Sequence, residues 1–225
     1  MFHRFYAIFA CALLTACGQI DYDAAPEGKF TGALLVMWVG EGTQSGDGRF
    51  VFVPSPKQPL TFTRNNAKAT ITKIQPEMMY TDGGSIPRAA TLFQGFSPWG
   101  YAPAYMVHDW IFVARHCLTD GSPTDAERSV AQMSFVESAQ IIAEAIKTLI
   151  ASDRVQPNDV APRVISGTVA GPVSYNRWVV KGACAEDRVS AAHRQQVRAA
   201  LAQRAGLRAL ALAGEPAEIV SEISF

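Results

Sequence analysis

The chain has 225 residues, of which 20 are Lys or Arg, 20 are Asp or Glu and 48% are hydrophobic. The near-zero charge balance argues against nucleic acid as a partner, because binding to phosphates needs an excess of cations. The length suits one domain, or one domain with a helical appendage.

Residues 1–16 have the pattern of a lipoprotein signal peptide. A basic start precedes an apolar run over 5–14, which is too short to span a bilayer as a mature helix. The run ends in Leu14-Thr15-Ala16-Cys17, which resembles the lipobox of bacterial lipoproteins. The resemblance implies a lipid on Cys17 and, because Gly18 follows, a place on the outer membrane facing the periplasm. The alternative is an ordinary secretory signal with an incidental cysteine.

The cysteines predict one disulfide. Cys11 leaves with the signal peptide and Cys17 carries the lipid, so that Cys117 and Cys184 remain as an even pair in an oxidising compartment. The loop that they close is long, and the bond is expected to stabilise the fold by several kcal/mol. A metal role is disfavoured because neither residue belongs to a Cys-x-x-Cys pair.

Composition divides the mature chain into three parts. Residues 17–30 are acidic, contain Pro and Gly, and predict a tether. Residues 31–184 predict an α+β domain in which N-terminal antiparallel β-strands precede a helical hairpin and further helices. Residues 185–225 predict a C-terminal helix, rich in Ala and Arg over 186–212, and a loose tail from Gly214.

The strands are expected before residue 80. Compact apolar runs and period-two alternation predict strands at four places, 34–39, 49–53, 60–63 and 70–74. Glycines over 40–48 and the pair Asn65-Asn66 suit the turns between them.

Helices are expected after residue 82. Ser85 can cap a short helix with Pro87 in its first turn. Helical spacing predicts one helix over 102–116 and a longer one over 124–151. Residues 163–180 are ambiguous, because Gly171-Pro172 either kinks or ends a helix.

A candidate site follows from His108 and the acidic residues around it. His108 is the best general base in the chain, because the ordinary pKa of histidine lies near neutrality. Its sequence neighbour Asp109 should point about 100° away around the helix, so we expect no hydrogen bond between the two side chains. We expect Asp125, at the start of the next helix, to orient His108 as its catalytic partner.

The same region predicts a cation site. Asp109 can bind a hard cation through oxygen, and an acidic residue within an apolar segment needs a partner. Asp82 and the carbonyls of Gly83 and Gly84 can add oxygen ligands, since a backbone close to a ligand tolerates no Cβ.

Structural roles compete with these functional ones. His108 can be a core histidine whose bond to Asp125 only holds two helices together, and Asp82 can cap the helix at Ser85. His116 is expected to face the helix dipole or solvent, and His193 to lie on a solvated helix face.

The motifs resemble domain of unknown function 1353, an uncharacterised bacterial and phage family. The matching residues are Thr81-Asp82-Gly83-Gly84-Ser85-Ile86-Pro87, Trp99-Gly100, His108-Asp109-x-Ile111-Phe112 and Asp125, within about residues 30–180. Four positions depart from the family pattern, namely Gly84 for Ala, Phe112 for Tyr, Thr124 for Ala and Arg128 for Phe. The His and the acids are intact, and the resemblance implies no established activity.

A weaker resemblance is to secreted phospholipase A2, whose catalytic helix also carries His-Asp. It implies His108 as the base, Asp109 as a calcium ligand and Asp125 as the orienting residue. The paired cysteines before the His and the Gly-rich calcium loop of that family are missing, so the likeness is an analogy of site.

Two functions of different class follow. The first is a lipid-anchored envelope hydrolase acting on phospholipid or peptidoglycan with the His-Asp site and calcium. The second is a non-catalytic envelope lipoprotein that binds a protein or cell-wall partner, with the same residues acting structurally. A water-filled cleft or a bound cation favours the first, and a dry, packed pair favours the second.

Overall fold

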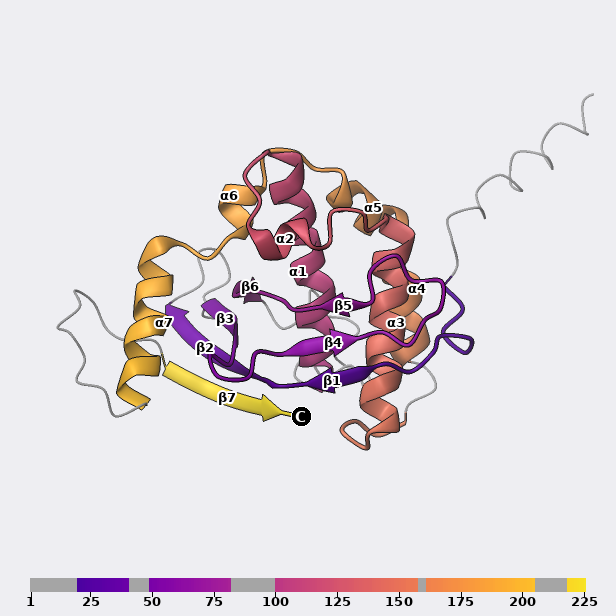
Figure 1. Ribbon diagram of the computed structural model, residues 1–225, viewed down its shortest axis with the longest axis horizontal. Helices are drawn as coiled ribbons and strands as arrows, with labels where there is room; N and C mark the ends of the chain where they lie inside the picture. Colours follow the sequence, from indigo (N-terminus) through magenta and orange to yellow (C-terminus); the bar gives the residue numbers. More distant parts are fainter. Residues whose placement is uncertain (1–19, 41–48, 82–99, 158–160, 205–217) are drawn as a thin grey trace, which may run out of the picture.

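The computed structural model describes residues 20–40, 49–81, 100–157, 161–204 and 218–225. It confirms an α+β fold in which two antiparallel sheets precede and contact a group of helices (Figure 1). The smaller sheet has the strand order β1 (Lys29–Thr31), β4 (Thr61–Thr63) and β5 (Lys73–Ile74). The larger sheet has the order β6 (Met79–Thr81), β3 (Arg49–Pro54), β2 (Ala33–Gly40) and β7 (Glu218–Ser224).

Strand β2 is apolar throughout because both faces of its sheet are covered. Leu34 and Val36 belong to the main core that the helices complete. Leu35 and Met37 point to the opposite face, where a second cluster includes Val197 of α7 (Ala191–Arg204). A strand that is buried on both faces has a continuous apolar sequence. The strand predicted over 34–39 is confirmed.

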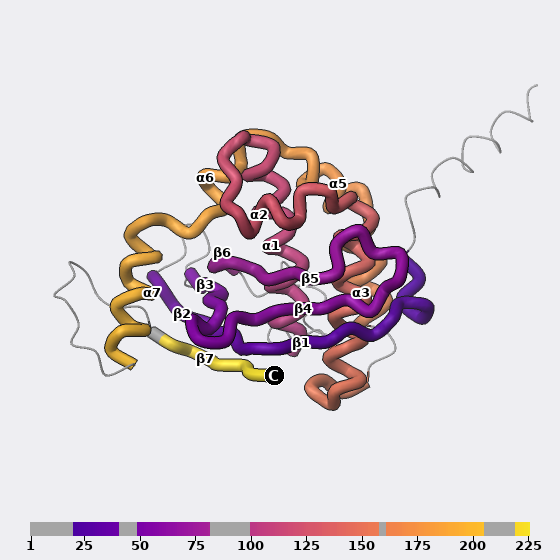
Figure 2. The backbone as a smooth tube through the Cα atoms, viewed as in Figure 1, coloured from indigo at the N-terminus to yellow at the C-terminus, as the bar shows by residue number. Residues whose placement is uncertain are grey.

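The C-terminal strand corrects the prediction of a loose tail. Residues Glu218–Ser224 form β7, which pairs antiparallel with β2 in a register that sets Leu34 opposite Ile223. Figure 2 shows the end of the chain returning beside its first strands. The last residues are therefore part of the domain and not an appendage to it.

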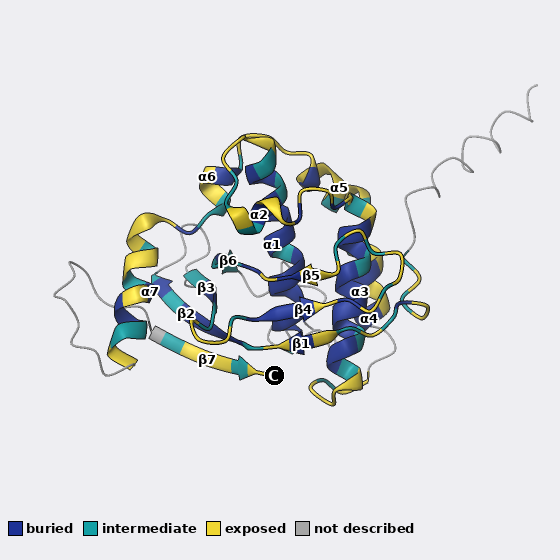
Figure 3. Ribbon diagram, in the orientation of Figure 1, coloured by how far each residue is buried: buried dark blue, intermediate teal, exposed yellow. Residues whose placement is uncertain are grey.

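Helix α1 (Ala102–Thr119) is the central helix of the fold and is buried along most of its length (Figure 3). The helix predicted over 124–151 is in fact two, α2 (Asp125–Arg128) and α3 (Phe135–Ala151). Ser134 starts α3 by accepting a hydrogen bond from the Glu137 amide. A capping side chain ends the continuity that apolar spacing alone suggested.

Two regions predicted as helical after residue 160 are each divided into two helices. Gly171 is the N-cap and Pro172 lies in the first turn of α5 (Pro172–Trp178), which separates it from α4 (Ala161–Val169). The helix predicted from residue 186 is divided into α6 (Cys184–Asp187) and α7. Within the described residues, no helix combines the length and apolarity needed to cross a membrane.

The predicted tether is packed against the domain from residue 20 onward. The Gly28 amide donates to Thr148 Oγ1 at 2.7 Å. The Asp23 carbonyl accepts from Lys147, and the Asp23 carboxylate pairs with Arg163. These contacts with α3 and α4 hold the described part of the segment, from Ile20 onward, against the domain.

A clasp joins the end of α1 to α6. The predicted disulfide between Cys117 and Cys184 is present, with an S–S distance of 2.00 Å. The Asp120 carboxylate accepts from the Gly182 amide at 2.8 Å and from the Cys184 amide at 3.0 Å. These two hydrogen bonds lower the pKa of Asp120 below its ordinary value. We call Cys117, Asp120, Cys184, His116 and Asp187 the α1–α6 clasp.

A buried ion cluster attaches the smaller sheet to α3. Arg64 lies next to β4, and its side chain is fully buried. Arg64 Nε and Nη2 donate to the Glu144 carboxylate at 2.7 and 2.9 Å, and Nη1 donates to Glu137 at 2.5 Å. Backbone amides of Thr70 and Ile71 also donate to Glu137. Every charge in the cluster thus has a partner, as burial requires.

Candidate functional site

One stripe of α1 carries the polar groups of the candidate site. Tyr101 precedes the helix, and Tyr105, His108 and Phe112 follow at spacings of three and four residues, which places them on one face. Ring contacts connect them: the Tyr101 and Tyr105 centroids lie 6.2 Å apart, and those of His108 and Phe112 lie 5.1 Å apart. All four residues are buried.

His108 and Asp109 form a hydrogen-bonded dyad. His108 Nδ1 lies 2.9 Å from Asp109 Oδ1, and the side chains are 5% and 33% exposed. The sequence-based expectation that these neighbours do not bond was wrong. The Cβ atoms do diverge by about 100°, but Nδ1 is close to the start of the ring and reaches sideways to the carboxylate.

The second ring nitrogen of His108 makes no hydrogen bond in the described structure. Nε2 is buried and has no hydrogen-bond partner among the described residues. Because Asp109 accepts only from an N–H, the neutral ring carries its proton on Nδ1 and its lone pair on Nε2. A buried polar atom without a partner is rare in a folded protein. An Nε2 with a free lone pair is the atom through which a histidine can act as a general base.

Two tyrosine hydroxyls share this condition. The hydroxyls of Tyr101 and Tyr105 are also buried without a hydrogen-bond partner among the described residues. Burial raises the pKa of Tyr105, and the negative charge of Asp109 raises it further. Burial also raises the pKa of Tyr101. Both side chains therefore keep their protons at neutral pH and are hydrogen-bond donors.

Asp125 does not belong to the dyad, which corrects its predicted role. Its side chain is 98% exposed and pairs with Arg128 of the same short helix. Thr124 occupies the N-cap of α2 and forms a capping box with Glu127. Asp125 is thereby placed at the first helical position, where side chains point to solvent and the carboxylate favours the helix dipole. Asp109 holds the position next to His108 that Asp125 was expected to fill.

The predicted calcium site is only partly within the described residues. Asp82, Gly83 and Gly84 lie outside them, as do Cys17 and the expected helix at Ser85. Asp109 Oδ1 is engaged by His108. In the part of the chain that the structure describes, no three His, Cys, Asp or Glu side chains converge in a way that could hold a metal ion.

The other two histidines of the described residues have partners that the sequence did not indicate. His116 is buried in the α1–α6 clasp, where Nδ1 faces the Asp187 carboxylate and Nε2 lies 2.7 Å from the Arg177 carbonyl. Two acceptors require two N–H donors, and the ring is therefore cationic. His193 Nδ1 lies 2.8 Å from the Tyr80 hydroxyl, which places it against β6 instead of on a solvated face.

Burial and hydrogen bonding act in opposite directions on these histidines. Burial alone lowers the pKa of His116, but the hydrogen bonds to Asp187 and to the Arg177 carbonyl outweigh it and raise the pKa above its ordinary value. For His193, burial and the nearby charge of Arg49 both lower the pKa.

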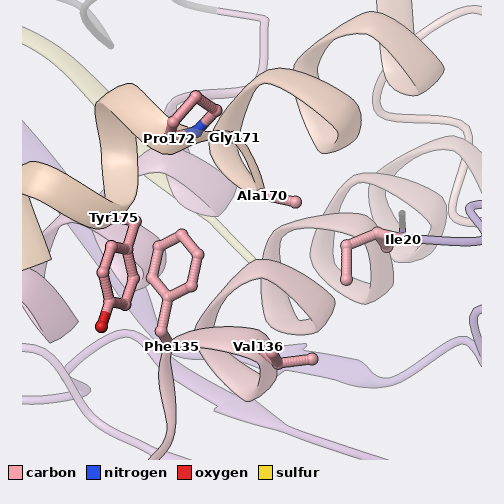
Figure 4. Close-up of a pocket in the computed structure, with 7 residues that line it drawn as sticks. All are labelled: Ile20, Phe135, Val136, Ala170, Gly171, Pro172 and Tyr175. Carbon is pink, nitrogen blue, oxygen red and sulfur yellow. The ribbon is translucent and has the colours of Figure 1, made fainter. Parts of the chain in front are cut away.

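Two pockets open on the described surface away from the dyad. An apolar pocket of about 230 Å³ lies between the start of α3 and the turn that joins α4 to α5 (Figure 4). Its lining consists of Ile20, Phe135, Val136, Ala170, Gly171, Pro172 and Tyr175. A more open pocket of about 280 Å³ lies beside Tyr22 and Lys147. Neither pocket is lined by His108 or Asp109.

No family model, no curated protein and no solved structure matches the chain.

Proposed function

We propose that this protein is a lipid-anchored hydrolase of the bacterial cell envelope in which His108 acts as general base on water. One observation carries the assignment. His108 Nδ1 is held by Asp109 at 2.9 Å, while Nε2 is buried without a partner in the described structure. The family resemblance implies no activity, so the dyad is the ground for the proposal.

The geometry suits removal of a proton from water. The Asp109 carboxylate fixes the ring orientation and stabilises the imidazolium that forms when Nε2 takes the proton. The hydroxide equivalent then attacks a carbonyl or phosphoryl centre, the bond to the leaving alcohol or amine breaks, and the imidazolium returns its proton to that leaving group. The hydroxyls of Tyr101 and Tyr105, which stay protonated, supply donors on the same face of α1 for the negative charge that develops.

The substrate class follows from the proposed location. The lipobox over Leu14–Cys17 would hold the domain at the outer membrane, within reach of phospholipid and peptidoglycan. The ester and amide bonds of phospholipid and of peptidoglycan are therefore the substrates to test. Calcium bound by Asp109 with Asp82, Gly83 and Gly84 is the proposed cation, and it would polarise the oxygen that gains charge.

A second function is favoured by the burial of the dyad. His108 is only 4% exposed and packs against Phe112, which suits a structural pair in a non-catalytic lipoprotein. In that case the protein would bind a protein or cell-wall partner through its surface. The two functions differ in what substitution of His108 does to turnover per folded molecule.

The deciding experiment measures hydrolysis and stability together. His108→Gln preserves size and one donor but removes the base, so turnover on phospholipid vesicles or peptidoglycan should fall by about 100-fold or more while the melting temperature holds. His193→Gln is the matched control, because it removes a partly buried histidine away from the dyad. A wild-type protein inert on both substrates, with and without calcium, would favour the binding lipoprotein.

The anchor is tested separately. Cys17→Ser should leave an uncleaved or soluble precursor, since no thiol is then present for the lipid. Processed Cys17→Ser protein that still fractionates with membranes would contradict the lipobox assignment.

A further inference from the structure

Exposed apolar side chains gather around one part of the fold. Among the described residues, six of the seven large apolar side chains that are strongly exposed lie between residues 136 and 180. Val173 on α5 is 81% exposed, and Val136 on α3 and Tyr175 on α5 are about half exposed. Exposed apolar residues scattered singly need no explanation, but a concentration around one short helix does.

Two of these residues, Val136 and Tyr175, line the apolar pocket, and Val173 directly follows Pro172 of the lining. Phe135 and Tyr175 meet edge to face, with ring centroids 5.2 Å apart, and form one wall (Figure 4). The pocket is therefore continuous with the exposed surface. We define the α5 face as Ile20, Phe135, Val136, Pro172, Val173 and Tyr175.

The proposed anchor attaches at this same face. Ile20 lines the pocket, and Cys17 precedes it by three residues. A fully extended chain spans at most about 3.6 Å per residue, so the Cys17 backbone lies within about 11 Å of Ile20. Any lipid on Cys17 therefore enters its bilayer next to the α5 face.

The charge around the face suits a lipid surface. Residues 161–185 contain three cations, Arg163, Arg177 and Lys181, and no carboxylate, although the whole chain is balanced. Arg163 pairs with Asp23, so Arg177 and Lys181 are the cations that count here. Arg177 pairs with Asp187 at 3.2 Å but is still 65% exposed, and Lys181 is exposed. Long cationic side chains can lay their stems along an apolar surface and place their charges among anionic headgroups.

We propose that the α5 face rests on the bilayer that holds the Cys17 lipid, with acyl chains of that bilayer filling the apolar pocket. This proposal rests on the proposed anchor but not on hydrolysis. It fixes one orientation, in which α3, α4 and α5 are nearest the membrane and the C-terminal strand β7 is away from it (Figure 1). The anchor and the face then act as two attachments.

The test places a fluorescent label on the lipidated full chain. The new thiol in Val173→Cys is the one to label, because Cys117 and Cys184 are joined and Cys17 carries the lipid. Val220→Cys is the matched control, a 54% exposed valine on β7. Each labelled protein is reconstituted into vesicles of phosphatidylethanolamine and phosphatidylglycerol, and the quenching of its label by aqueous iodide and by nitroxide-labelled acyl chains is measured.

The expected result is a several-fold weaker iodide quenching at position 173 than at position 220, together with nitroxide quenching at 173 alone. Equal iodide access at both positions in protein that floats with the vesicles overturns the proposal. Shielding at 173 without vesicles, increasing with protein concentration, overturns it in favour of a second copy of the chain.

The outcomes separate this face from the proposed function. If the protein does not float with vesicles, the proposed anchor and the proposed docking are both wrong. If the protein floats with position 173 shielded but hydrolyses neither substrate, the docking is supported and the hydrolase proposal is wrong. The melting temperature of each labelled protein shows that the substitution leaves the fold intact.

Discussion

His108 Nδ1 and Asp109 Oδ1 lie 2.9 Å apart, so two residues adjacent in the sequence form a hydrogen-bonded pair within one turn of α1. A dyad built from neighbours needs no second element to bring the partner in. The opposite ring nitrogen is buried without a hydrogen-bond partner among the described residues, so a proton transfer there would be screened from bulk water.

Asp109→Asn tests the orienting role. The amide can offer its N–H₂ group to Nδ1 and so favours the tautomer with the proton on Nε2, which removes the base without removing a hydrogen bond. We expect kcat to fall by about 100-fold or more, with KM nearly unchanged and the fold intact. A fall in stability with unchanged kcat would show that Asp109 only holds His108 in place.

The disulfide prediction concerns stability. Replacing Cys117 and Cys184 by Ser opens a link that spans 67 residues of sequence, which should lower the free energy of unfolding by about 4 kcal/mol through the entropy of the unfolded chain. Urea unfolding of oxidised wild type and the double variant measures this difference. An unchanged urea midpoint would mean that the hydrogen bonds of Asp120 hold the clasp by themselves.

The clasp should also make stability depend on pH through His116. Its pKa is raised in the folded protein, so the folded state binds the proton more tightly than the unfolded state. The contribution is complete below about pH 6.5, the ordinary value for histidine, and is lost as the pH rises through the folded pKa. His116→Gln should remove this loss from urea midpoints measured across neutral pH.

His193 gives a control of opposite sign. Its pKa is lowered in the folded protein, so protonation favours the unfolded state and stability is lost as the pH falls below the ordinary histidine value. His193→Gln should therefore flatten the acid side of the same curve. Midpoints that respond on the same side for both variants would contradict the assignment.

The buried ion cluster predicts a large effect of one charge. Arg64→Leu leaves the carboxylates of Glu137 and Glu144 buried without their cation, which should lower the free energy of unfolding by about 3–5 kcal/mol. The exposed pair of Arg204 with Glu222 is the control, and Arg204→Leu should cost about 1 kcal/mol or less. Comparable effects of the two substitutions would show that Arg64 is not buried as described.

The sequence predicted the parts of the fold that depend on local pattern. The apolar runs over 34–39 and 49–53 are strands, the run from residue 102 is a helix, and the remaining cysteines are joined. It missed β7, because a strand of mixed composition is fixed by pairing with β2, which lies nearly the whole chain away. Hydrophobic spacing also predicted α2 and α3 as one helix, because it carries no information about the cap at Ser134.

The candidate site divides in the same way. Residue type alone singled out His108 as the centre of the candidate site, because histidine is the side chain that titrates near neutrality, and its role as a base stays a prediction. Asp109 was not predicted as the partner of His108. Helix geometry separates neighbouring Cβ atoms, but rotation of the ring still lets Nδ1 reach the adjacent carboxylate. The exposure of Asp125 depends on Thr124 taking the cap, a local competition that spacing between helices does not reveal.

The pairing of β7 with β2 has a consequence for when the protein can fold. The larger sheet sets Leu34 beside Ile223, so its central strand lacks one neighbour until the last residues are available. Closing so long a loop is slow, and the apolar β2 keeps an open edge while synthesis proceeds. A chain that still lacks β7 therefore presents β2 as an unpaired apolar edge, which invites pairing with the strand of another copy.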